Sequence, residues 1–172
     1  MRPFGATGLQ ISAVSFGAGA VGGAVIGGEP EDRVAIMRYA MDRGINWVDT
    51  APYYGSGKSE EHLGQIFRAL GDRPYISTKV RLWPGDFEDI GAAIERTARE
   101  SLARLGLERV ELLQLHNRVH VVRDLDREAI SVDDVLGPGG VADALERLRG
   151  LRLTQHIGFT GLGDAEALHA LI

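Results

Sequence analysis

The fold is decided by two short apolar runs, Tyr75-Ile-Ser-Thr-Lys-Val80 and Val110-Glu-Leu-Leu-Gln-Leu115, and by the stretch that separates them. Between residues 88 and 105 the apolar side chains recur at the spacing of one helix face, and Gly106 is placed to end the helix. Each run has the length and composition of a buried strand. A strand, a helix and a second strand in this order predict a parallel βαβ unit.

The same order extends along the chain. Further strands are expected at residues 14–16, 45–48 and 155–159, and further helices at residues 32–43, 59–70 and 141–149. Ser59 is expected to be the N-cap of its helix, because two acidic residues follow it. Residues 2–12 are expected to form a β-hairpin. We therefore predict an α/β fold of five βα units that forms a single domain over residues 1–172.

The composition narrows the classes of function. The 172 residues include 19 Lys and Arg against 24 Asp and Glu, which gives a formal net charge of −5 and argues against nucleic acid as the main partner. Cysteine is absent, and His116 and His120 lack the glutamate of a helical zinc motif, so no metal site is expected. Without a secretory signal or an apolar stretch approaching ~18 residues, we expect a cytoplasmic enzyme or binding protein that does not bind membranes.

Three ionisable residues stand where consecutive strands end: Asp49, Lys79 and His116. The carboxyl ends of parallel strands form the functional face of such folds, so these residues are expected to converge there. Each also has an ordinary structural interpretation, as a turn residue, a solvated charge or a hydrogen-bonded loop residue. Their types are nevertheless complementary, since a carboxylate fixes an ammonium and a fixed ammonium favours a nearby phenolate. Tyr53 and Tyr54 follow Asp49 and offer that phenol.

These motifs resemble the aldo-keto reductase superfamily. The resemblance rests on Asp49-Thr-Ala-Pro-Tyr-Tyr54-Gly with Ser59-Glu60, on Ser77-Thr-Lys79, and on Leu113-Gln-Leu-His116-Asn. It implies a (β/α)8 barrel of the TIM type, and a catalytic tetrad made of Asp49, Tyr54, Lys79 and His116. It also implies direct hydride transfer between NAD(P)H and a carbonyl substrate, with Tyr54 as the proton donor, Lys79 paired to Asp49, and His116 orienting the carbonyl.

The glycine-rich stretch Gly17-Ala-Gly19-Ala-Val-Gly22 allows a second interpretation. It has the spacing of the dinucleotide fingerprint of Rossmann folds, but that fingerprint needs a helix to begin at once, and helical periodicity starts only near Glu31. We therefore interpret Gly17 to Gly22 as the end of the first barrel strand and not as a Rossmann fingerprint. The resemblance then places the cofactor, NADP or NAD, against Gly19, Ala20, Asp49 and Thr160, whereas Gly161 replaces an Asn that many family members carry.

The length raises an alternative. Five units in 172 residues imply roughly 275 for eight, so the barrel is expected to be incomplete. The motifs look most like the branch of sugar dehydrogenases, which favours a small carbonyl or sugar substrate. The alternative is a half-barrel without catalysis or cofactor binding, which serves as an interaction module and self-associates through open sheet edges. The connection from Arg118 to about Leu136 is expected to be a solvated loop over the mouth of the barrel.

Overall fold

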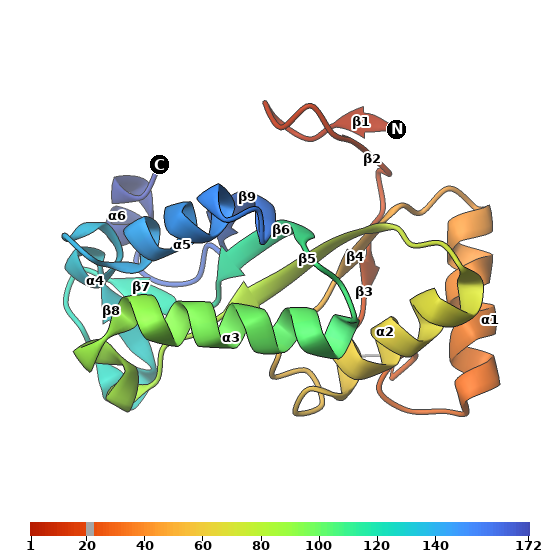
Figure 1. Ribbon diagram of the computed structural model, residues 1–172. Helices are drawn as coiled ribbons and strands as arrows, with labels where there is room; N and C mark the ends of the chain where they lie inside the picture. The colour runs from red at the N-terminus through yellow and green to blue at the C-terminus, as the bar shows by residue number, and fades with distance from the viewer. Residues whose placement is uncertain (20–22) are drawn as a thin grey trace. The chain divides into compact units, whose positions relative to one another are not determined.

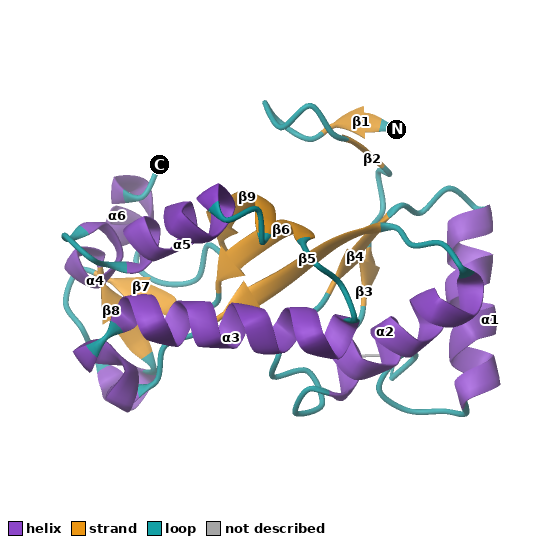
Figure 2. Cartoon of the chain, viewed as in Figure 1, coloured by secondary structure: helices purple, strands orange, loops and turns teal. Residues whose placement is uncertain are grey.

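The computed structural model describes residues 1–19 and 23–172, and these divide into two compact units. The first unit comprises residues 1–78 and 100–112, and the second comprises residues 79–99 and 113–172. One five-stranded sheet has the strand order β3-β4-β5-β6-β9, and its strands are labelled in Figures 1 and 2. The residues of β5 and those of β6 are divided between the two units. Strands alternate with helices along the chain, as the apolar pattern predicted.

The first unit opens with a short hairpin and continues into parallel strands. Its elements are β1 (Arg2–Pro3), β2 (Gln10–Ile11), β3 (Phe16–Gly17), α1 (Pro30–Asp42), β4 (Trp47–Asp49), α2 (Lys58–Leu70), the first part of β5 (Tyr75–Val80), and, from residues 100–112, the end of α3 (Ile90–Leu105) and the first half of β6 (Val110–Leu115). The antiparallel pairing of β1 with β2 confirms the predicted hairpin. Gly17 pairs with Asp49, and Asp49 pairs with Ser77, so the carboxyl ends of β3 and β4 are in register with each other and lie beside the middle of β5. Helices α1 and α2 lie side by side (Figure 1).

The second unit contains the elements that follow β5. They are η1 (Pro84–Glu88), most of α3 (Ile90–Leu105), the end of β6 (Val110–Leu115), β7 (Arg118–His120), η2 (Leu125–Arg127), β8 (Ala129–Ser131), α4 (Val132–Leu136), α5 (Val141–Gly150), β9 (Thr154–Phe159) and α6 (Ala165–Ala170). Helix α5 confirms the helix that was predicted at residues 141–149; it packs on β9, and its residues Val141, Leu145 and Leu148 are buried. Among the described residues, no helix is both long enough and apolar enough to cross a membrane.

The structure corrects three local predictions. The strand predicted at residues 14–16 begins only at Phe16. Val14 lies before it, is 64% exposed, and accepts a hydrogen bond from the Ser12 hydroxyl through its carbonyl oxygen. Ser59 is not an N-cap, because Gly57 occupies that position with a φ of 92° and Ser59 lies inside α2 with its side chain fully buried. The connection after β6 is not a solvated loop, since β7 and β8 pair in it and bury Val119 and Ile130.

The glycine-rich stretch does not lead directly into a helix. Gly17 ends β3, and α1 begins only at Pro30, which agrees with the delayed periodicity seen in the sequence. The helix N-terminus that a Rossmann fingerprint needs is therefore not placed directly behind this strand. Ala20, which was predicted to contact the cofactor, and Gly22 lie outside the described residues.

Candidate functional site

Asp49 ends β4 with its carboxylate held by a neighbouring strand. The Ser77 hydroxyl donates to Asp49 Oδ1 at 2.8 Å, and Trp47 Nε1 donates to the same hydroxyl oxygen at 3.1 Å. Ser77 is almost fully buried, and its backbone oxygen accepts from the Thr50 amide at 2.9 Å. The buried hydroxyl thus has one proton and directs it at the carboxylate, which fixes the orientation of the predicted acidic residue.

Tyr54 lies in the turn that follows β4, beside the backbone of the glycine-rich stretch. A Cβ atom placed on Gly19 would lie 3.6 Å from Cε2 of the Tyr54 ring. The next residue, Gly55, has a φ of +63°, and a Cβ there would lie 2.8 Å from Ile26 Cγ2. Only glycine fits this position, because the left-handed backbone and the close approach of Ile26 both exclude a side chain. The first unit therefore brings together two predicted site residues, Gly19 and Tyr54.

A buried hydroxyl pair connects the segments that carry these residues. Ser59 Oγ donates to the Ala18 carbonyl oxygen at 2.8 Å and lies 2.8 Å from Thr50 Oγ1. Ser59 and Thr50 have no exposed surface, and Ala18 is 1% exposed. The N-cap interpretation overlooked this role. The helical spacing offered a signal for it, because Ser59 falls on the same buried stripe of α2 as Leu63 and Ile66.

A second buried polar residue was also missed. Glu60 has no exposed surface, and its carboxylate accepts from Arg104 Nε at 2.8 Å and from Thr78 Oγ1 at 2.5 Å. A buried carboxylate needs such partners to remain charged. Thr78 directly precedes Lys79, so Glu60 anchors the strand residue next to a predicted catalytic lysine.

The second unit holds the other predicted residues at the ends of β5, β6 and β9. Lys79 lies in β5 and is 4% exposed. The His116 amide donates to the Val80 carbonyl at 2.8 Å, and the Thr160 amide donates to the Leu115 carbonyl at 3.0 Å. Residues 80, 116 and 160 therefore lie side by side at the carboxyl ends of three neighbouring strands. Asp49 and Tyr54 belong to the first unit, and the joint action of all four tetrad residues stays a prediction.

The side chain of Thr160 fits a binding role. Its hydroxyl oxygen is buried and has no hydrogen-bond partner among the described residues. Buried hydroxyls are normally satisfied, so an orphaned one next to a strand end is suited to a bound polar group. Gly161, the next residue, has a φ of 62° and offers no side chain.

An ion pair stabilises the folded connection that follows β7. Arg123 binds the carboxylate of Asp134 through two nitrogen atoms, and Ser131 donates to the same carboxylate at 2.7 and 2.8 Å. Burial by itself would raise the pKa of Asp134, but the hydrogen bonds from Arg123 and Ser131 outweigh it and lower that pKa below its ordinary value. The hydrogen bond to Asp134 raises the pKa of Arg123 in turn. Arg118 and Arg127, the other arginines of this connection, remain exposed.

The sequence matches the model of the "Aldo/keto reductase family" over residues 13–171. It is 34% identical over 165 residues to L-galactose dehydrogenase of Arabidopsis thaliana, which covers 94% of this chain and 48% of that protein. It is 31% identical over 182 residues to D-threo-aldose 1-dehydrogenase of a Pseudomonas species, which covers 89% of this chain and 51% of that protein.

Solved structures of similar fold include members of the same family. An aldo-keto reductase from Klebsiella pneumoniae in complex with NADPH superposes with a TM-score of 0.70 and 27% identity, over 94% of this chain and 49% of that chain. The glycerol dehydrogenase of Gluconobacter oxydans superposes with a TM-score of 0.68 and 28% identity, over 93% and 47%. The chain thus spans about half the length of these relatives. The predicted α/β fold of the TIM-barrel type is confirmed.

Proposed function

Because this chain belongs to the aldo/keto reductase family, we propose that it supplies the catalytic residues of an NAD(P)-dependent oxidoreductase. The reaction transfers a hydride between a nicotinamide cofactor and the carbonyl or alcohol carbon of a small substrate. One observation carries the proposal: Asp49, Lys79 and His116 lie within one residue of the ends of three strands that are consecutive in one sheet, and Tyr54 lies in the turn that follows the first of them. This is the functional end of parallel α/β folds.

The proposed roles follow from the chemistry of the four side chains. In the reducing direction, Tyr54 Oη gives its proton to the substrate oxygen as the carbonyl carbon becomes tetrahedral. The positive charge of Lys79 stabilises the phenolate that remains on Tyr54, and Asp49 balances that charge. His116 donates a hydrogen bond to the same substrate oxygen and orients it. The buried position of Lys79 supports this assignment, because a buried ammonium is costly unless a function or a partner retains it.

The described residues fit a nicotinamide cofactor, NADP or NAD. When bound, this group supplies the hydride, and the protein supplies its position. The buried, orphaned hydroxyl of Thr160 offers a hydrogen bond to the carboxamide, and the backbone at Gly19 offers a flat surface beside Tyr54. Asp49 is proposed as the third contact. The relatives that are crystallised with NADPH or NADP support this choice of cofactor.

We propose a sugar or a related hydroxylated carbonyl compound as the substrate. The supporting observation is the similarity to proteins named as L-galactose dehydrogenase and D-threo-aldose 1-dehydrogenase. The predicted cytoplasmic location stays a prediction. So does self-association through the open sheet edges at β3 and β9, which size-exclusion chromatography with light scattering tests directly.

Cofactor binding and the Tyr54→Phe variant test the proposed function. Titration with NADPH, followed by its fluorescence, is expected to show saturable binding. Tyr54→Phe is expected to leave this binding unchanged and to lower turnover of an aldose by a factor of about 100 or more, the usual contribution of a general acid. Full turnover in the variant would exclude Tyr54 as the proton donor. Absence of any NADPH binding would favour the alternative, a half-barrel that does not catalyse a reaction.

A further inference from the structure

A small pocket in the second unit lies next to two proposed catalytic residues along the chain. Its volume is about 120 Å³. It begins two residues beyond Lys79 and one residue beyond His116. The lining residues are Arg81, Leu82, Trp83, Pro84, Asn117, Leu125, Glu128 and Ile130. The strand ends that carry the catalytic residues therefore continue directly into the pocket wall.

The floor of the pocket is fixed by a side chain that follows His116. Asn117 accepts a hydrogen bond from the Leu82 amide at 2.8 Å and donates to the Leu82 carbonyl at 3.0 Å. Asn117 is 3% exposed, and Leu82 and Ile130 are equally well buried. Both polar atoms of the amide bind the backbone of Leu82, which fixes the orientation of Asn117 in the pocket wall. The pocket is therefore preformed.

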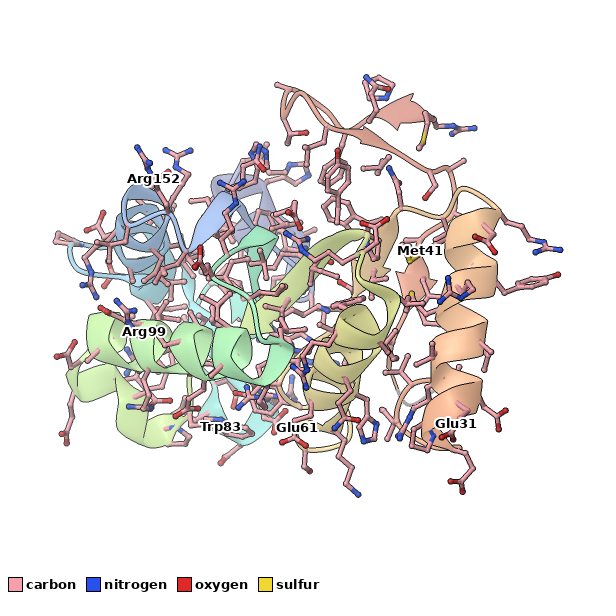
Figure 3. All side chains as sticks on the ribbon, turned by 45° about the vertical axis from the view of Figure 1, so that its right-hand side comes forward. Glu31, Met41, Glu61, Trp83, Arg99 and Arg152 are labelled. Atoms are coloured by element: carbon pink, nitrogen blue, oxygen red, sulfur yellow. The ribbon has the colours of Figure 1, made fainter. Side chains whose placement is uncertain are left out.

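The rim of the pocket carries an ion pair and an aromatic ring. The Arg81 guanidinium binds the Glu128 carboxylate and lies 4.5 Å from the centroid of the Trp83 ring. Trp83, labelled in Figure 3, is 44% exposed, and the Glu128 side chain is 58% exposed. The Arg81 side chain is only 17% exposed, so the pair is open to solvent on the Glu128 side alone. Glu128 also holds a left-handed backbone, with a φ of 56°, which non-glycine residues adopt uncommonly.

We propose that this pocket binds the hydroxyl-bearing end of a neutral sugar, and this inference rests on the proposed function of the chain. Arg81 offers N–H donors and Glu128 offers acceptors side by side, which suits a pair of neighbouring hydroxyl groups. The Trp83 ring offers an apolar surface for the C–H groups of a sugar ring. Pockets for whole drug-sized ligands begin at about 300 Å³, so this one holds a single end of a small molecule.

The charge balance separates a neutral sugar from an anion. Glu128 already compensates the charge of Arg81, so the rim is neutral as a whole. An anionic group such as a phosphate would have to displace the carboxylate of Glu128 or bear its repulsion. A neutral polyol meets no such repulsion and can use both partners of the pair. The pocket is thus expected to discriminate against phosphorylated sugars.

Calorimetric titration of the protein with D-galactose and with D-galactose 6-phosphate, with and without NADPH, tests the proposal. The neutral sugar is expected to bind, and the phosphorylated sugar is expected to bind at least several-fold more weakly. Trp83→Leu and Glu128→Gln are each expected to raise the Kd for D-galactose by roughly tenfold, the size of a lost aromatic contact or charge-assisted hydrogen bond. Both positions are exposed, so the variants are expected to fold, which circular dichroism checks.

Tyr39→Leu is the matched control. Tyr39 is a 59% exposed ring on α1 in the first unit, and the Arg43 guanidinium lies 3.4 Å from its centroid, so the substitution removes a similar surface pair elsewhere. It is expected to leave galactose binding unchanged. The proposal is overturned if wild type does not bind D-galactose, if the phosphorylated sugar binds more tightly, or if Trp83→Leu and Glu128→Gln bind like the control.

The NADPH arm separates this inference from the proposed function. Galactose binding without NADPH binding would support the pocket and contradict the oxidoreductase. NADPH binding without galactose binding would overturn the pocket and leave the oxidoreductase standing. Where turnover is measurable, the rim variants are expected to raise KM for the sugar about tenfold and leave KM for an aldehyde without hydroxyl groups unchanged.

Discussion

Replacing Ser59 by alanine is expected to destabilise the first unit, because one buried hydroxyl makes two hydrogen bonds. The hydroxyl has a single proton and the Ala18 carbonyl can only accept, so that proton goes to Ala18 and Thr50 must donate to Ser59. Ser59→Ala therefore removes the donor of one buried group and the acceptor of another. At about 1 to 3 kcal/mol for each of the two groups that lose this hydrogen bond, we expect a loss of about 2 to 6 kcal/mol.

The coupling between Ser59 and Thr50 gives a sharper test. Thr50→Val removes the donor but leaves the Ser59 hydroxyl bound to Ala18, so it is expected to cost only about 1 kcal/mol. In that background Ser59→Ala orphans only the Ala18 carbonyl, and its cost is expected to fall by about 1 kcal/mol or more. Ser15→Ala is the control, since Ser15 is exposed in the same unit and is expected to change stability by less than about 0.5 kcal/mol.

The assay is urea unfolding followed by tryptophan fluorescence. The chain has two tryptophans, so in a Trp83→Phe background the buried Trp47 reports on the first unit alone. The free energies of unfolding of the two single variants and the double variant complete the cycle. Additive costs to within about 0.3 kcal/mol, or a cost of Ser59→Ala no larger than that of the control, would refute the argument.

Three further predictions concern stability. Gly64→Ala in α2 would place a Cβ 2.7 Å from two backbone oxygens at the end of α3, and we expect it to lower the free energy of unfolding by about 1 to 3 kcal/mol. Gly91→Ala in α3 is the control, because a Cβ there has its nearest neighbour at 3.5 Å; it is expected to be neutral or slightly stabilising, and thermal unfolding measures both variants. Glu60→Gln keeps the shape of the buried carboxylate and is expected to cost about 1 to 2 kcal/mol in urea, against about 3 or more for Glu60→Ala; equal costs would contradict this. The pKa of Asp134 is lowered in the folded protein, so its stabilising contribution is present above about pH 4 and is lost as the pH falls through the folded pKa; Asp134→Asn is expected to remove that part of the acid dependence of the unfolding midpoint, and an unchanged profile would contradict it.

The strands that could be predicted residue for residue are those that are buried on both faces. Tyr75–Val80 and Val110–Leu115 are nearly continuous buried runs, so burial alone marks their ends. The three-residue strands β7 and β8 could not be predicted, because they lie among charged residues and exist through their pairing with each other. The ion pair of Arg123 with Asp134 could not be predicted for the same reason, since the two residues become neighbours only in the folded chain.

The candidate site divides in the same way. The location of Asp49, Lys79 and His116 at or near strand ends could be predicted, because each follows or closes an apolar run that is visible in the sequence. The roles of Ser59 and Glu60 could not be predicted, because they depend on Ala18, Thr78 and Arg104, which are distant in sequence. A serine before two acidic residues also fits the N-cap pattern well, and only the fully buried side chain distinguishes the two cases.

Buried polar contacts, and not apolar packing alone, fix the strand ends that carry the proposed chemistry. Ser77 orients the Asp49 carboxylate in the first unit, and Asn117 holds the backbone of Leu82 in the second. In each contact a buried side chain hydrogen-bonds within the protein, and this fixes the position of the strand end before any ligand binds. In the pair of Arg81 and Glu128, the Glu128 carboxylate is open to solvent, with 58% of its side chain exposed. Substitutions at the buried contacts should therefore change stability and catalysis together, whereas substitutions at the exposed rim should change substrate choice with little change in stability.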